Sequence, residues 1–152
     1  MKKLLIGLIL LLFSGTLAFA ANPETFSINM VIRQVITISN TAPLDFGTLE
    51  LIANTYTVNA CACPHSAGAG ASSATFTVQG ENLAVADVTF VTNPITITDG
   101  ATVRNVTLTV ASTHTFNGAA QTLYVGGSVT LDATETTGGT YTGTAQLQMV
   151  YQ

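Results

Sequence analysis

The sequence has few charged side chains and no tryptophan. Only 8% of its 152 residues are charged, with four lysines and arginines against eight aspartates and glutamates. Two of the four cations, Lys2 and Lys3, lie at the extreme N-terminus, so Arg33 and Arg104 are the only strong cations in the remainder. Two separated arginines form no basic patch, which argues against nucleic-acid binding through phosphate contacts.

Long apolar runs are missing beyond the N-terminus. Residues 1–20 contain the two lysines, an apolar run at residues 4–13 and the small-residue end Ala18-Phe-Ala20. This is the pattern of a secretory signal peptide, with cleavage expected before Ala21. The run is shorter than the ~20 apolar residues of a membrane helix, so the mature chain should have no transmembrane segment. With two arginines against eight acidic residues, that mature chain has a net charge of about −6.

Motifs for catalysis or cofactor binding are also missing. The chain has two histidines, but no nucleophile elbow, no phosphate-binding glycine loop and no motif with paired carboxylates. We therefore expect neither an enzyme nor a bound cofactor.

The only two cysteines form a local cluster, Cys61-Ala-Cys63-Pro-His65. In an oxidising compartment Cys61 and Cys63 could form a disulfide, within the chain if the backbone bends, or between subunits. Alternatively they are free thiols in a surface loop rich in alanine, glycine and serine. The third interpretation is a soft metal site, because residues i, i+2 and i+4 of an extended chain share a face, which adds His65 as a ligand.

The remaining composition favours strands. Threonine, valine, alanine and glycine are frequent, and no stretch shows a capped helical stripe. A mature chain of about 132 residues suits one domain with one core. Many short strands separated by turn signals predict an all-β, immunoglobulin-like sandwich, although its Cys-Trp-Cys pattern is absent. The expected strands cover residues 26–39, 44–51, 55–60, 74–79, 87–92, 95–98, 105–111, 122–131 and 140–151.

Both ends of the mature chain show a period of two, which predicts a strand with one buried face. Near the N-terminus, the large apolar residues at alternate positions are Phe26, Ile28, Met30 and Ile32. Val31 and Val35 offer a competing odd phase. At the C-terminus, the residues on odd positions are Gly139, Tyr141, Ala145, Leu147, Met149 and Tyr151.

The C-terminal strand, with a glycine fourteenth from the end and a penultimate tyrosine, resembles the chaperone-binding strand of Gram-negative chaperone–usher fimbrial subunits. Over the whole mature chain, the sequence is similar to secreted, pilin-like bacterial domains related to alpha-type and common-pilus subunits. The segments that carry this resemblance are Leu44-Asp-Phe-Gly-Thr-Leu, Ala74-Thr-Phe-Thr-Val-Gln-Gly80-Glu, Leu123-Tyr-Val-Gly-Gly-Ser-Val and Gly139-Thr-Tyr-Thr-Gly-Thr.

The resemblance implies an incomplete sandwich that is completed by donor-strand exchange. Residues 21–33 would be the donated extension, with Phe26, Ile28, Met30 and Ile32 inserted into a neighbour, and residues 34–152 the pilin-like domain. Its expected partners are copies of itself, a periplasmic chaperone and an outer-membrane usher. The expected product is a cell-surface fimbria for adhesion or biofilm formation, reached by secretion through the periplasm.

Two alternatives remain from the sequence. The first is a secreted monomer whose N-terminal strand fills its own groove, with a metal at Cys61, Cys63 and His65. The second is a carbohydrate- or protein-binding tip adhesin, which the single-domain length disfavours.

Overall fold

The computed structural model describes residues 24–132 and 138–152. The predicted signal peptide at residues 1–20 lies outside the described residues. Contacts divide the chain into two units, Met1–Ile32 and Arg33–Gln152, which are described separately below. No helix within the described ranges is long and apolar enough to cross a membrane.

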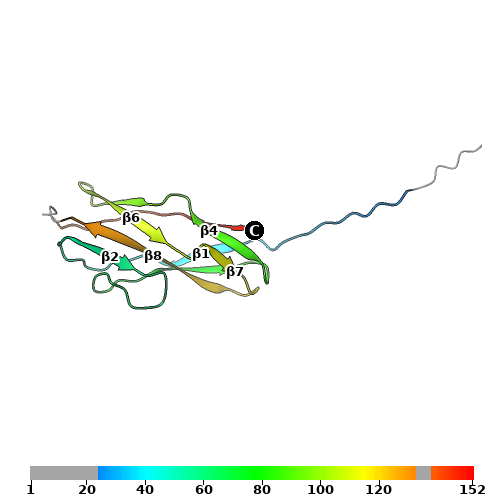
Figure 1. Cartoon of the computed structure of the whole chain (residues 1–152), viewed down its shortest axis with the longest axis horizontal. Helices are drawn as coiled ribbons and strands as arrows, with labels where there is room; N and C mark the ends of the chain where they lie inside the picture. Colours follow the sequence, from blue (N-terminus) through cyan, green and yellow to red (C-terminus); the bar gives the residue numbers. More distant parts are fainter. Residues whose placement is uncertain (1–23, 133–137) are drawn as a thin grey trace, which may run out of the picture. The chain divides into compact units, whose positions relative to one another are not determined.

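The second unit is an all-β sandwich, as the sequence predicts. Its described residues form the following strands: β1 (Thr37–Ala42), β2 (Asn54–Val58), β3 (Ala74–Gln79), β4 (Val85–Phe90), β5 (Ile95–Thr98), β6 (Val103–Thr109), β7 (Thr113–Thr115), β8 (Gln121–Leu131) and β9 (Leu147–Tyr151) (Figure 1).

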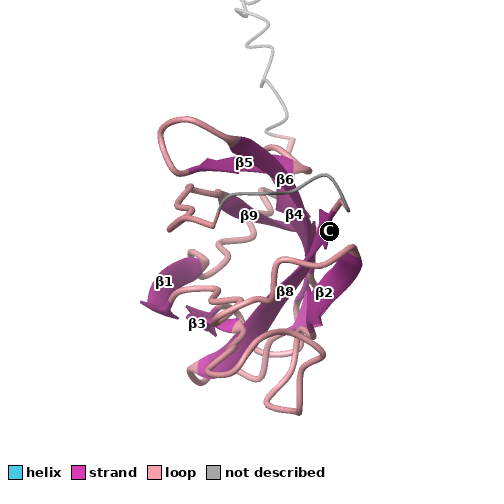
Figure 2. Cartoon of the chain, turned by 90° about the vertical axis from the view of Figure 1, so that its left-hand side faces the viewer, coloured by secondary structure: helices cyan, strands magenta, loops and turns pink. Residues whose placement is uncertain are grey.

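The strands form two antiparallel sheets. The larger has the order β1-β3-β8-β6-β5, and β2 also pairs with β8. The smaller has the order β7-β4-β9. Figure 2 shows the larger sheet curving around β4 and β9. Both β1 and β9 are therefore edge strands, since neither has a second pairing partner among the described residues.

Two clusters of side chains make up the core between the sheets. The first surrounds Phe116, Val78 and Met149, and the tyrosine ring of Tyr151 packs against it. The second surrounds Tyr56, Val106, Leu108 and Val129. Around this second cluster several large side chains are only half-buried: Leu44, Phe46, Leu49, Phe90, Ile95, Ile97 and Leu131. One end of the sandwich is consequently packed less completely than the other.

Gly126 in β8 marks a close approach between two segments of backbone. A Cβ atom at this position would lie 2.2 Å from the Val58 carbonyl oxygen and 2.7 Å from the Ala60 nitrogen. Only glycine leaves room for this contact. It allows the end of β2 and the residues after it to lie close beside β8.

The predicted strand bounds agree best with the structure where apolar and polar residues alternate without interruption. β3 and β5 have the predicted bounds, and β2, β4, β6 and β8 lie within two residues of them at each end. β7 was not predicted. The prediction was wrong for residues 26–36, which form no strand, and for residues 44–51, which make only single bridges at Asp45 and Thr48.

The described part of the first unit, residues 24–32, contains no helix or strand. Its four predicted donor side chains are largely exposed, at 82% for Phe26 and Ile28 and 79% for Met30 and Ile32. Val31, on the competing face, is 84% exposed. Exposure therefore does not distinguish the two faces of this segment.

Candidate functional site

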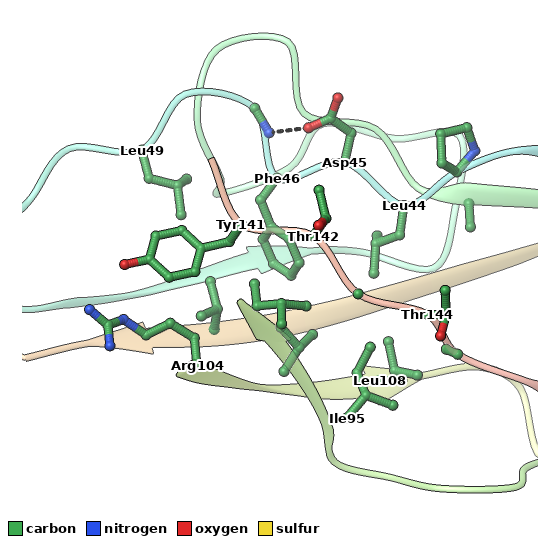
Figure 3. Close-up of a pocket in the computed structure, with 18 of the residues that line it drawn as sticks. Leu44, Asp45, Phe46, Leu49, Ile95, Arg104, Leu108, Tyr141, Thr142 and Thr144 are labelled. Carbon is green, nitrogen blue, oxygen red and sulfur yellow. Dashed lines mark hydrogen bonds between the residues drawn. The ribbon is translucent and has the colours of Figure 1, made fainter. Parts of the chain in front are cut away.

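A groove of about 1030 Å³ lies at the loosely packed end of the sandwich. Its floor is the inner face of the larger sheet, including Phe76, Val106, Leu108 and Val129. Residues 43–49 form one wall and residues 138–147 the other. Figure 3 shows Leu44, Phe46 and Leu49 on the first wall, facing Tyr141 and Thr142 on the second.

The first wall follows β1 and alternates in burial. Leu44, Phe46 and Leu49 are half-buried and line the groove, whereas Asp45 and Thr48 are exposed. Asp45 and Thr48 bond through their backbone to Ser72 and Ala69. The backbone hydrogen-bond partners of this wall lie between residues 68 and 72, so its edge toward the groove has none among the described residues.

The second wall leads into β9. Like the first wall, it forms backbone hydrogen bonds with described residues only on the side that faces away from the groove. Thr142 exchanges two backbone hydrogen bonds of 2.9 Å with Thr98, the last residue of β5, and the Val91 N–H donates to the Gln146 carbonyl at 3.0 Å. β9 itself pairs with β4. Within residues 138–152, backbone pairing is thus confined to the side of β4 and β5.

The inner face of β1 is only partly covered by other side chains. Ile38 lies opposite Val78 and Asn40 opposite Phe76, so both point to the inside of the sheet. Val78 is completely buried, but Ile38 remains 37% exposed. An inner-face isoleucine would normally be covered by the opposing sheet. The sandwich therefore has two backbone edges along its groove that no described residue pairs, and Ile38 of β1 is only partly covered.

A polar cluster borders the groove where the second wall begins. The Arg104 guanidinium lies over the Tyr141 ring at 5.3 Å. In the adjoining turn, the Asp99 carboxylate accepts hydrogen bonds from the Thr102 N–H at 2.7 Å and the Ala101 N–H at 2.9 Å. These backbone donors stabilise the charged form and lower the pKa of Asp99 from its ordinary value.

The penultimate residue, Tyr151, fastens the other end of β9. Its hydroxyl donates to the Gln34 carbonyl and accepts from the Glu81 N–H, both at 2.8 Å. Its ring packs edge-on against Phe116, with centroids 5.8 Å apart. A Cβ atom on Gly80 would lie 2.7 Å from the tyrosine hydroxyl, so glycine is needed there. Tyr151 therefore ties β9 to the chain before β1 and to the turn after β3.

The C-terminal residues singled out in the sequence are only partly brought together as one strand face. Leu147, Met149 and Tyr151 point inward, because they are buried or half-buried while Gln148 and Val150 are exposed. Tyr141, Ala145 and Gly139 line the groove instead, in a stretch with no continuous strand. The predicted strand at residues 140–151 is reduced to β9 and a single bridge at Thr142.

Cys61 and Cys63 are joined in a disulfide, with Cα atoms 5.2 Å apart. His65, the third residue of the cluster, accepts a hydrogen bond at Nδ1 from the Asn59 N–H at 3.1 Å. Among the described residues no group of three histidine, cysteine or acidic side chains is arranged to hold a metal ion. The interpretation of Cys61, Cys63 and His65 as a metal site therefore gains no support.

Sequence reasoning missed most of the groove. The sequence predicts a strand at residues 44–51, whereas Leu44, Phe46 and Leu49 form a wall of the groove, and no sequence pattern singles out Phe90 or Ile95. The alternation within Leu44-Asp-Phe-Gly-Thr-Leu was the available signal. The contact of Tyr151 with Gln34 and Gly80 joins residues far apart in the sequence, so no local pattern indicates it.

Over residues 36–151 the chain matches a family described as a domain of unknown function, DUF4402. No curated protein and no solved structure matches the chain significantly.

Proposed function

We propose that this chain, which belongs to the DUF4402 family, is a structural subunit of an extracellular fimbria assembled by donor-strand exchange. Residues 26–32 of one copy would enter the groove of the next as an added strand. The observation that carries the proposal is the apolar groove of about 1030 Å³ between residues 43–49 and residues 138–147, two backbone segments whose edges toward the groove no described residue pairs. Strand addition satisfies such edges with main-chain hydrogen bonds and fills the groove with alternate side chains.

The dimensions of the segment suit this groove. Seven residues in strand conformation span roughly 23 Å, and the ten residues of the second wall, if extended, span roughly 33 Å. One face of the segment carries Phe26, Ile28, Met30 and Ile32, all at least 79% exposed. Burying each of these side chains is worth ~1.5–3 kcal/mol before ordering costs are subtracted. The segment thus has apolar surface to bury, and the groove has apolar surface to cover.

The terminal strand supports the proposed assembly partners. Residues 139–147 have a backbone edge beside the groove that no described residue pairs, and a periplasmic chaperone could bind there before exchange. The N-terminal signal pattern and the resemblance to pilin-like domains support secretion through the periplasm, an usher and a cell-surface location. Adhesion or biofilm formation would be the outcome, with no enzymatic role.

Deleting residues 22–32 tests the proposal directly. The truncated subunit keeps its groove but loses its donor, so it should stay soluble, bind a synthetic peptide of residues 24–33 and form no filaments. Electron microscopy would assess filaments, and fluorescence anisotropy of a labelled peptide would assess binding. As a control pair, one peptide should carry serine at 26, 28, 30 and 32, and the other serine at 29 and 31, since residue 27 is already serine. Only the first should fail to bind.

The opposite result would favour the self-complemented monomer. That protein would lose stability on deletion, and its intact form would remain monomeric at high concentration. It would also fail to bind the peptide after partial denaturation and refolding. If full-length protein behaves this way, donor-strand exchange between copies should be abandoned.

A further inference from the structure

The disulfide between Cys61 and Cys63 lies in a loop that other contacts already shape. The loop joins β2 to β3, and Thr57 and Ser66 form a bridge across its base. Asn59 donates from its side chain to the Pro64 carbonyl at 2.9 Å and from its backbone to His65 Nδ1 at 3.1 Å.

Further hydrogen bonds hold the first cysteine. The Cys61 N–H donates to the Asn59 carbonyl at 2.9 Å, and the buried Ser73 hydroxyl donates to the Cys61 carbonyl at 3.2 Å. None of the hydrogen bonds in this loop uses a sulfur atom. The loop around the two cysteines is therefore shaped by hydrogen bonds as well as by the disulfide.

The disulfide encloses only one residue, Ala62. A cross-link constrains the unfolded chain less as the loop it closes becomes shorter. This bond should consequently add far less to the stability of the domain than a long-range disulfide would. Both cysteines are half-buried and the residues between and after them, Ala62 and Pro64, are exposed, so a small thiol can approach.

We propose that Cys61 and Cys63 form a reversible thiol–disulfide exchange site for low-molecular-weight thiols of the glutathione class. A thiolate attacks one sulfur, the disulfide bond breaks, and the other cysteine leaves as a thiolate that takes up a proton. A second thiolate then attacks the mixed disulfide. This attack is on the sulfur of the small molecule, so the two small thiols leave joined as a disulfide. The protein cysteine leaves as a thiolate, which takes up a proton, and the protein is left with two thiols. Two electrons have moved from the small thiols to the protein, and the reverse sequence returns them.

The scaffold explains why the exchange is reversible. After reduction the loop contacts keep the two Cα atoms near 5.2 Å, which is within the range that a disulfide requires. The second thiol is therefore always close to a mixed disulfide on the first. Reoxidation is intramolecular and fast, while reduction does not require the domain to unfold. This site is separate from the groove and does not depend on the proposed fimbrial role.

The test uses the full-length secreted protein, equilibrated with mixtures of reduced and oxidised glutathione under native conditions. Maleimide labelling and mass spectrometry count the thiols, and circular dichroism monitors the fold. Two thiols should appear together as the reduced fraction rises, disappear when it falls, and leave the spectrum unchanged. The single variants Cys61→Ser and Cys63→Ser should each accumulate a mixed disulfide with glutathione.

A variant of Asn59 tests whether the loop contacts favour the disulfide, or whether the cysteines react only because they are exposed. Asn59→Ala removes the bond to Pro64 and should shift the equilibrium several-fold toward the dithiol, while Asn105→Ala, at an exposed position on β6, should not. The proposal is overturned if thiols appear only in denaturant, if reduction unfolds the domain, or if the reduced protein does not re-form its bond with oxidised glutathione. It is also overturned if neither single variant captures glutathione.

Discussion

Replacing Tyr151 with phenylalanine should measurably weaken the domain, although it removes a single oxygen atom. That oxygen accepts from the Glu81 N–H and donates to the Gln34 carbonyl, both at 2.8 Å. A neutral hydrogen bond contributes about 0.5–1.5 kcal/mol net, and a buried donor left without an acceptor costs about 1–3 kcal/mol. The Glu81 amide is only partly buried, so we expect a loss of about 1–3 kcal/mol in the free energy of unfolding.

The same site provides an internal control through Gly80. A methyl group there would lie 2.7 Å from the Tyr151 hydroxyl and 2.8 Å from a Phe116 ring carbon. Gly80→Ala should therefore cost about 1–3 kcal/mol by overpacking. In the Tyr151→Phe background the oxygen is gone and only the Phe116 contact remains. The double variant should consequently lose less than the sum of the two single losses.

Urea unfolding of the four proteins, followed by circular dichroism, measures this coupling. We expect an interaction free energy above about 0.5 kcal/mol. Two results would refute the reasoning: a Tyr151→Phe variant within about 0.5 kcal/mol of wild type, or strictly additive losses. Either would mean that the tyrosine hydroxyl does not bridge β9 to Gln34 and Glu81 in solution.

Two further predictions concern the groove and its adjoining turn. Ala145→Arg places a charge on an exposed groove residue and should abolish filaments and peptide binding without unfolding the domain, whereas Gln148→Arg, on the outer face of β9, should do neither. Electron microscopy and peptide anisotropy would check both variants. Because the folded pKa of Asp99 is lowered, its carboxylate stabilises the turn above the ordinary carboxyl pKa, and this contribution disappears as the pH falls through the folded value. The difference in melting temperature between wild type and Asp99→Asn should therefore shrink at acidic pH, and a difference independent of pH would contradict the argument.

The sequence predicted individual strands better than it predicted their partners. β3 and β5 are short alternating runs between turn residues, so local pattern was sufficient. Residues 44–51 alternate as well, but Gly47 has a φ of 68° and its N–H bonds to the Asp45 carboxylate at 2.8 Å, which interrupts the ladder (Figure 3). Residues 26–36 also alternate, yet alternation specifies a face and not the strand beside it. Strand pairing depends on contacts between distant segments, which no short window contains.

The candidate site shows the same limit. Sequence reasoning identified the apolar face of residues 147–151, because this face follows from a local pattern. It could not choose among the three interpretations of Cys61 and Cys63, since the bend that joins them comes from Asn59 and Ser73. It also missed the groove, whose walls are far apart in the chain.

The contacts at the start of the domain bear on whether the donor segment fills its own groove or that of another copy. The Arg33 side chain donates to the Gln152 carbonyl at 3.1 Å, and the Gln34 carbonyl accepts from Tyr151. Residues 26–32 end directly before these two anchored residues. The groove reaches β9 at Leu147, whereas Arg33 and Gln34 are held at the other end of that strand, at Gln152 and Tyr151. The segment could fill its own groove only by running back along β9, and insertion into a second copy does not require this, which is an argument for exchange between subunits.

This argument predicts the effect of a longer connection. Inserting about six glycine and serine residues between Ile32 and Arg33 would allow the segment to turn back while Arg33 and Gln34 stay anchored. Filaments should then give way to closed monomers that refuse added peptide, because the linked donor has a high effective concentration. Size-exclusion chromatography and peptide anisotropy would follow the change, and the same insertion between Ala119 and Ala120, in the exposed turn before β8, serves as the control. If the linker variant still polymerises like wild type, anchoring at Arg33 and Gln34 does not decide which groove is filled.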